Sequence, residues 1–194
     1  ASKIPSKTSV TEIKQHDEPE NLVTPKVTLS MPKFLAKTTA LSGAEKGTIM
    51  HKVLQTLNLK TQYTKEMLKE HIAKLVSNHM LTEEEADAVK IDSLYTFTQS
   101  ELAKQIRNAT EIEQEKPFYI AIPASKLYEY TGNEDILVQG IIDLYFRDEA
   151  GKIVLVDYKT DYVQNEQELV HKYHKQIELY QEALERALGE KVDR

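Results

Sequence analysis

Residues 140–161 read GIIDLYFRDEAGKIVLVDYKTD, two apolar segments on either side of a short polar one. The pattern predicts a β-hairpin that carries Asp143 in its first strand and Asp157 and Lys159 in its second. An ionised carboxylate in so apolar a hairpin costs several kcal/mol unless it is paired or binds a metal. The two acids therefore indicate a functional site; the alternative is an ion pair on an exposed sheet face.

The turn decides whether the two acids meet. We expect a three-residue loop in which Gly151 takes a positive φ, so that Asp148 faces Lys152. Counted inward from that pair, Asp143 lies opposite Asp157, with the two Cβ atoms roughly 5 Å apart. Strand alternation then sends the lysine two residues later to the same face. A loop one residue shorter or longer would put the acids on opposite faces of the sheet.

Two carboxylates this close repel each other unless a proton or a cation lies between them. Mg²⁺, or Mn²⁺ as its substitute, prefers oxygen ligands, so we expect Asp143, Asp157 and the backbone carbonyl of Tyr158 to share a metal shell with water. Lys159 would lie beside that water, where it can orient or deprotonate the nucleophile and offset transition-state charge. This arrangement predicts phosphodiester hydrolysis.

The residues of this predicted site also resemble a known family. The order GIID at residues 140–143, DYKTD at 157–161 and QIELY at 176–180 is similar to the motifs of RecB-like PD-(D/E)XK nucleases. Upstream, GTIMH at residues 47–51 resembles the family's helical histidine motif, and EKPF at 115–118 resembles its first-strand motif.

Within that family, the chain resembles the C-terminal nuclease domains of AddA-type subunits of bacterial helicase-nucleases, including TSVTEIK at residues 8–14. The main likeness extends from about residue 42 to residue 189. It implies cleavage of single-stranded DNA that upstream helicase domains of the same polypeptide have unwound. It also implies a partner of the AddB type and a role in double-strand-break repair by homologous recombination. No iron–sulfur cluster is expected, because the chain has no cysteine.

The same resemblance implies that His51, Asp143 and Asp157 are metal ligands and that Lys159 is the catalytic lysine. Judged from its residues alone, a single histidine beside an apolar helical stripe is more often structural than ligating. The spacing of His51 after Gly47, upstream of an acid pair, favours the metal.

Three further residues have two interpretations each. Glu115 either supports the metal water or Lys159 from outside the metal shell, or it is a solvated acid at a strand edge. Gln176 and Tyr180 share one face of a helix expected over residues 165–188. Either they contact the scissile DNA strand, or Gln176 hydrogen-bonds strand-end backbone and Tyr180 belongs to the core.

The composition is typical of a single soluble intracellular domain. The 194 residues suffice for one substantial core. No apolar run has membrane-spanning length, so we expect a cytoplasmic protein with no membrane partner. The net charge of −6 argues against a free-standing protein that binds duplex DNA. Tethering to a helicase would make a high affinity for DNA unnecessary, because it raises the effective concentration of the strand. The chain has no Walker sequence, and therefore no predicted ATP site.

We expect an α/β fold of the restriction-endonuclease type, with a mixed central sheet flanked by helices and an N-terminal helical subregion. Residues 1–33 are predicted to be a largely irregular extension, and residues 34–194 to be the nuclease domain. Within that domain, residues 34–108 would be helical and residues 109–194 would hold the sheet and the catalytic core. The chain ends where the family continues into a further strand, which suggests an excised fragment.

Two other functions are open at this point. The chain could be a non-catalytic DNA-binding or assembly module on the same fold, although the complete set of Asp143, Asp157 and Lys159 disfavours loss of turnover. It could also be an RNA-cleaving relative, because a metal–phosphate mechanism does not itself distinguish the 2′-hydroxyl.

Overall fold

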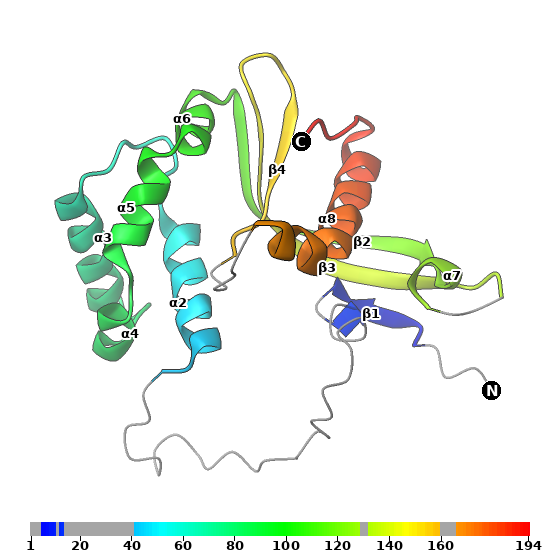
Figure 1. The fold of residues 1–194 in the computed structure, drawn as a ribbon, viewed down its shortest axis with the longest axis horizontal. Helices are drawn as coiled ribbons and strands as arrows, with labels where there is room; N and C mark the ends of the chain where they lie inside the picture. The colour runs from blue at the N-terminus through cyan, green and yellow to red at the C-terminus, as the bar shows by residue number, and fades with distance from the viewer. Residues whose placement is uncertain (1–4, 11, 14–40, 129–131, 160–165) are drawn as a thin grey trace, which may run out of the picture.

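The computed structural model describes residues 5–10, 12–13, 41–128, 132–159 and 166–194. Within these residues a four-stranded mixed sheet is flanked by helices (Figure 1), which confirms the predicted α/β fold class. In chain order the elements are β1 (Lys7–Ser9), α2 (Gly43–Thr56), α3 (Lys65–Ser77), α4 (Glu83–Asp87), α5 (Ile91–Gln99), α6 (Glu101–Asn108), β2 (Glu111–Pro123), α7 (Ala124–Leu127), β3 (Asp135–Arg147), β4 (Ile153–Val156) and α8 (Glu166–Leu188). No helix in the described part of the chain combines the length and apolarity needed to cross a membrane.

Short polar motifs begin the N-terminal helices. At the start of α2, Ser42 Oγ accepts a hydrogen bond from Glu45 N at 3.2 Å, and the Glu45 carboxylate accepts one from Ser42 N at 2.9 Å. Thr82 and Glu85 form the same reciprocal pair at the start of α4. Each pair satisfies backbone N–H groups that the first helical turn leaves without partners. The start of α2, the helix that carries His51, is therefore determined by residues close to it in the sequence.

Strand β3 organises the sheet. It pairs with β2 in antiparallel register at residues 135–142 and 144–147. Along its other edge it pairs in parallel with β1 at residues 137–139 and antiparallel with β4 at residues 144–147. Residues 140–143 lie between these two partners, and Asp143 stands at the end of this gap. A side chain placed there can be reached by the chain that leaves β4.

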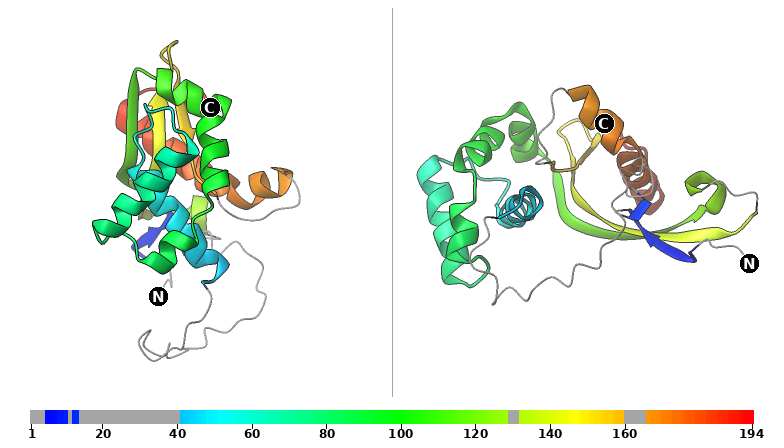
Figure 2. Two further views of the ribbon diagram at one scale, coloured as in Figure 1. Left: turned by 90° about the vertical axis from the view of Figure 1, so that its left-hand side faces the viewer. Right: turned by 60° about the horizontal axis from the view of Figure 1, so that its bottom comes forward.

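The buried residues of β3 belong to two cores. Ile136, Val138 and Ile142 pack in a cluster with β2 and α8, whereas Leu144 and Phe146 pack in a cluster with α2, α3, α5 and α6. Figures 1 and 2 show these helices on one side of the molecule and α8 on the other. Among these residues the change of core occurs across residue 143, whereas Tyr145 packs in the cluster with α8, so the predicted site lies where the two cores meet.

The β3–β4 hairpin has the predicted turn. Gly151 has a φ of +82°, and Asp148 N donates to Lys152 O at 2.9 Å. The Asp148 carboxylate also accepts hydrogen bonds from the N–H groups of Ala150 and Lys152, both at 2.9 Å. These contacts set the register of the two strands that lead to the site.

Gly151→Ala is expected to lower the free energy of unfolding by about 1–2 kcal/mol. A Cβ at this position would meet no atom within 4 Å, so the cost comes from forcing an L-residue into the left-handed region. Urea unfolding of this variant can be compared with that of Gly43→Ala, where a Cβ also meets nothing and φ is not positive. Equal stability of the two variants would contradict the role of Gly151 in the turn.

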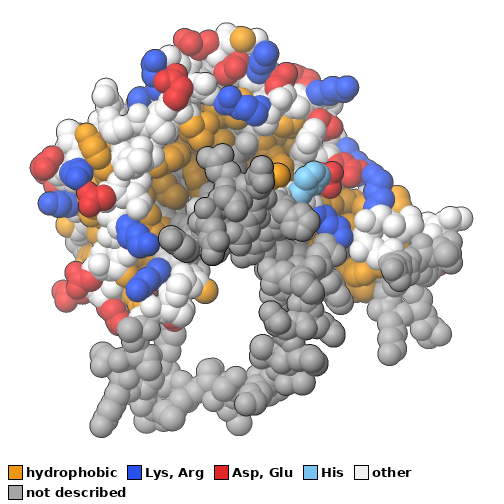
Figure 3. Space-filling view, viewed as in Figure 1, with side chains coloured by type: hydrophobic (Ala, Val, Ile, Leu, Met, Phe, Trp, Pro, Cys, Tyr) orange, Lys and Arg blue, Asp and Glu red, His pale blue; other side chains and the backbone are white. Residues whose placement is uncertain are grey.

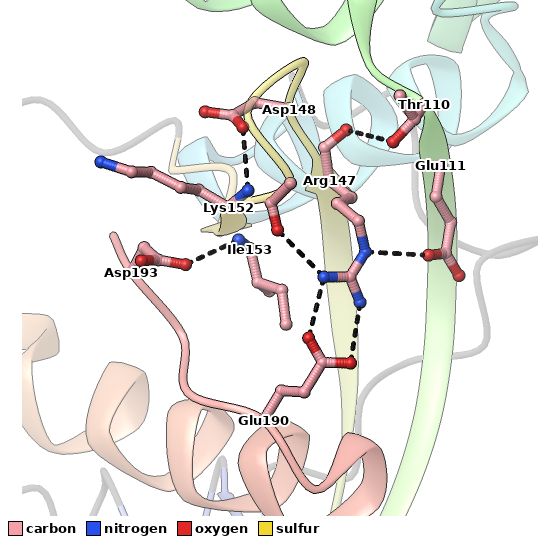
Figure 4. Close-up of polar contacts among 9 residues, drawn as sticks. Thr110, Glu111, Arg147, Asp148, Lys152, Ile153, Glu190 and Asp193 are labelled. Atoms are coloured by element: carbon pink, nitrogen blue, oxygen red, sulfur yellow. Dashed lines mark hydrogen bonds and ion pairs between the residues drawn. The ribbon is translucent and has the colours of Figure 1, made fainter.

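Arg147 ties the hairpin to the end of α8 (Figure 4). Its Nη1 and Nη2 atoms lie 2.9 and 3.2 Å from the two oxygens of Glu190, and its Nε atom lies 3.5 Å from Glu111. Beyond Glu190, Asp193 exchanges backbone and side-chain hydrogen bonds with Ile153, each at 2.9 Å. The C-terminal residues thus hold the outer edge of β4, the strand that leads directly into Asp157.

Within residues 1–33, for which we predicted a largely irregular extension, residues 7–9 form β1, an element that we did not predict from the sequence. Val10 and Ile13, which follow it, are 4% and 2% exposed and pack in the α8 core. A three-residue strand is too short to show alternation, and its partner β3 lies far along the chain. Residues 1–4, 11 and 14–33 lie outside the described part, and the division at residues 34–108 and 109–194 stays a prediction.

Candidate active site

The sheet register places three carboxylates in a row. Residues 114 and 116 of β2 pair with residues 144 and 142 of β3, so Glu115 falls opposite Asp143. On the other edge, Leu144 pairs with Val156, so the next position puts Asp157 opposite Asp143, as predicted from the turn. Asp143 is therefore flanked by an acid on each side.

His51 from α2 completes one half of the site. Its Nε2 atom lies 2.6 Å from the backbone oxygen of Tyr158, and its Nδ1 atom lies 3.8 Å from Asp143 Oδ2. The same Asp143 oxygen accepts a hydrogen bond from Tyr158 N at 2.8 Å. The structure thus brings together His51, Asp143 and the Tyr158 carbonyl, three of the donors predicted from sequence.

Asp157 and Lys159 form the other half. The Asp157 side chain is 4% exposed; its Oδ2 atom contacts Lys159 Nζ, and its Oδ1 atom accepts a hydrogen bond from Gln176 Nε2 at 3.0 Å. The lysine ammonium also lies 4.6 Å from the centre of the Tyr173 ring, within the range of a cation–π contact. Sequence reasoning missed this role of Tyr173. The contact could have been predicted from the position of Tyr173 three residues before Gln176, which puts both side chains on one face of α8.

Glu115 lies within the site and not at a solvated edge. One of its oxygens, Oε1, is buried without a hydrogen-bond partner, and Gln55 on α2 hydrogen-bonds the carboxyl group. Its φ of +53° is in the left-handed region, which costs an L-residue about 1–2 kcal/mol. Such strain clusters at functional sites, so these observations favour the supporting role of Glu115 over the solvated-acid alternative.

The carboxyl groups of Asp157 and Glu115 both have raised pKa values. Burial raises the pKa of Asp157, and the neighbouring Asp143 raises it further, while the Lys159 ammonium opposes both effects. Burial likewise raises the pKa of Glu115, with Asp143 again adding to the shift. The site gathers negative charge around Asp143, and a bound cation would stabilise it.

Gln176 and Tyr180 act together at the base of the site. Gln176 Nε2 lies 2.9 Å from the Tyr180 hydroxyl as well as contacting Asp157. Tyr180 is 6% exposed, packs edge-on against Phe118 at 5.6 Å between ring centres, and has its pKa raised to about 12 by burial. The structure favours the core interpretation of Tyr180. The partner of Gln176 is the Asp157 side chain, whereas the interpretation without DNA contact had paired Gln176 with strand-end backbone.

The groups of the site that could bind a metal are of the chemical types that a hard divalent ion accepts. Two facing carboxylates, a backbone carbonyl and an imidazole are ligands that Mg²⁺ or Mn²⁺ accepts, and the Glu115 oxygen without a partner lies on the same row. Within the described residues, no three histidine, aspartate or glutamate side chains are arranged to hold a metal by themselves. Water and the Tyr158 carbonyl would therefore have to contribute to the metal shell.

Known proteins are similar to this chain along nearly its whole length. A model of the PD-(D/E)XK nuclease superfamily matches residues 26–193. The A subunit of an ATP-dependent helicase/nuclease from Clostridium botulinum (strain 657 / Type Ba4) is 40% identical over 202 residues, which cover 99% of this chain and 16% of the relative. The protein of the same name from Clostridium novyi (strain NT) is 36% identical over 206 residues, with the same two coverages of 99% and 16%. The chain thus spans 16% of the length of these curated relatives.

Proposed function

The chain belongs to the PD-(D/E)XK nuclease superfamily, and from that membership we propose that it is a divalent-metal-dependent deoxyribonuclease domain. It hydrolyses phosphodiester bonds of unwound single-stranded DNA, as part of an AddAB-type helicase-nuclease in double-strand-break repair by recombination. The observation that carries the proposal is the convergence of His51, Asp143, Asp157 and Lys159 around the backbone of Tyr158.

His51, Asp143, Asp157 and the Tyr158 carbonyl would hold the ion, which we take to be Mg²⁺ with Mn²⁺ as a substitute. When bound, such an ion polarises the scissile phosphate and lowers the pKa of water. The chain orients these donors before substrate arrives. Gln176 fixes one oxygen of Asp157 at 3.0 Å, and the lysine contacts the other.

Lys159 is the catalytic lysine in this proposal. Its side chain is 22% exposed and its ammonium is held between Asp157 and the Tyr173 ring, so its charge has a defined position at the edge of the site. From there it orients the attacking water and offsets the negative charge that develops on the phosphate oxygens. Glu115 supports this arrangement from the adjacent strand.

The wider assembly follows from the same proposal. The two relatives are named as helicase/nuclease subunits, which supports helicase domains in the same polypeptide and an AddB-type partner. The net charge of −6 gives the chain little affinity of its own for DNA, and a tethered motor supplies the strand at high effective concentration. We place this activity in the cytoplasm, and assign this chain neither an ATP site nor an iron–sulfur cluster.

Incubation with labelled single-stranded DNA, duplex DNA and RNA, with and without Mg²⁺ or Mn²⁺, tests the proposal. We expect cleavage of single-stranded DNA only when the metal is present. Preferred cleavage of RNA would favour the RNA-cleaving alternative. Binding of DNA without cleavage under any metal condition would favour the non-catalytic module.

His51→Ala is expected to weaken metal binding more for Mn²⁺ than for Mg²⁺, because imidazole is a softer ligand than a carboxylate. The loss for Mn²⁺ should be at least on the order of tenfold, the lower end of what altered metal surroundings cost. Calorimetric titration with each ion measures it, and a thermal melt in EDTA checks that the variant folds. Equal losses for both ions, or none, would return His51 to a structural role.

A further inference from the structure

A cavity of about 600 Å³ opens between α2, α5 and the residues that follow β4. Asp157 and Lys159 form part of its wall, so it is continuous with the candidate active site. Figure 3 shows apolar side chains gathered on the face between the helical part and the hairpin. A cavity of this volume is in the range that binds small organic ligands.

The wall of the cavity away from Asp157 is apolar. Met50, Leu54 and Leu94 in this wall are buried, and Phe97 and Leu102 are partly buried. A flat aromatic group therefore fits this wall better than a charged one. Unpaired nucleic-acid bases stack on apolar and aromatic side chains, whatever their sequence.

Two lysines line the cavity at its exposed side. Lys46 on α2 and Lys90 at the start of α5 are exposed, and neither side chain has an ion pair or hydrogen bond to the residues that the structure describes. The acid among the described lining residues is Asp157, which pairs with Lys159. The cavity entrance is thus locally basic in a chain of net charge −6, which matches a phosphate backbone.

We propose that this cavity binds one unpaired nucleotide of the substrate strand, next to the scissile phosphate. The base lies against the apolar wall, and the flanking phosphates contact Lys46 and Lys90. A base within a duplex would have to unpair and leave its stack to enter, so the cavity selects single strands. The inference rests on the proposed nuclease function and adds the residues that position and select the strand.

Strand binding in EDTA tests the proposal without cleavage. Fluorescence anisotropy of a short labelled single strand is measured over a range of salt concentrations with the wild type and with Lys46→Gln/Lys90→Gln. The double variant should bind about tenfold more weakly at low salt. Its slope of log K against log salt should be about 1.4 smaller, because each lost phosphate contact removes about 0.7 for single strands.

Lys69→Gln/Lys74→Gln is the matched control, because it removes the same charge from exposed positions on α3 outside the cavity. We expect the control to bind like the wild type. An equal loss in both double variants, or an unchanged salt slope in Lys46→Gln/Lys90→Gln, would overturn the assignment of the two lysines.

Two modified substrates test the place of the base. The wild type should bind an abasic single strand about tenfold more weakly than a normal one, because the stacking contribution is lost. A blunt duplex should bind more weakly still and without dependence on the two lysines. Equal binding of normal and abasic strands, or lysine-dependent binding of the duplex, would overturn the nucleotide pocket.

A cleavage assay with Mg²⁺ separates this inference from the nuclease proposal. Lys46→Gln/Lys90→Gln should raise KM for single-stranded DNA while kcat stays within about twofold, since neither lysine takes part in bond breakage. A wild type that never cleaves but binds strands through these lysines would overturn the nuclease proposal alone. A wild type that cleaves while both lysines are dispensable would overturn the cavity assignment alone.

Discussion

Asp143→Ala and Asp157→Ala are each expected to abolish metal-dependent cleavage while the domain stays folded. Each substitution removes an oxygen donor from the place where the ion supplies both the nucleophile and charge stabilisation. Removing one of two facing acids also relieves their repulsion, which partly offsets the lost contacts to Tyr158 N or Lys159. Calorimetry with Mn²⁺ measures the metal affinity, and single-turnover cleavage measures the rate. A thermal melt checks that the domain stays folded.

Two further variants sharpen this test. Asp157→Asn keeps a side-chain oxygen that can accept the hydrogen bond from Gln176 while it removes the charge, so its loss of cleavage reports on the carboxylate and not on packing. Asp87→Ala removes an exposed acid at the end of α4 and should leave cleavage unchanged. Unchanged metal affinity in both Asp143→Ala and Asp157→Ala would contradict their assignment as ligands.

Lys159→Ala is expected to retain metal binding but to lose about 10²- to 10⁴-fold in the rate of single-strand cleavage, the usual cost of removing one positioned acid–base or charge-stabilising group. Lys159→Arg should restore little activity. A guanidinium stays protonated, and its planar fork does not match the position that the ammonium occupies between Asp157 and the Tyr173 ring.

Metal titration beside single-turnover cleavage separates these outcomes for Lys159. Lys152→Ala is the matched control, because it removes an exposed lysine from the same hairpin, close to the turn and away from the acids. Cleavage by Lys159→Ala at the wild-type rate would remove this lysine from the mechanism. Loss of metal binding in the same variant would place it in the metal site itself.

The part of the site that sequence predicted is the part that local chemistry determines. One glycine at positive φ sets the hairpin register, and strand alternation then brings Asp143 opposite Asp157 with no knowledge of the rest of the fold. The capping residues of α2 are local in the same sense, and this helix carries His51.

The part that sequence did not predict depends on contacts between distant segments. Strand β1 is three residues long and gains its identity from a parallel partner far along the chain. The contact of Tyr173 with Lys159 depends on the position of α8, whose Gln176 hydrogen-bonds Asp157 at the end of β4. The cavity beside Lys46 and Lys90 exists because α2 and α5 pack on the hairpin, which no spacing in the sequence encodes.

We propose that the carboxylates beside Tyr158 make this chain a metal-dependent nuclease. Single-turnover cleavage of labelled single-stranded DNA by the wild type and by Asp157→Asn, in Mg²⁺ and in EDTA, tests it most directly. We expect cleavage by the wild type in Mg²⁺ alone and none by the variant under either condition. Wild-type cleavage that persists in EDTA, or Asp157→Asn cutting at the wild-type rate, would contradict it.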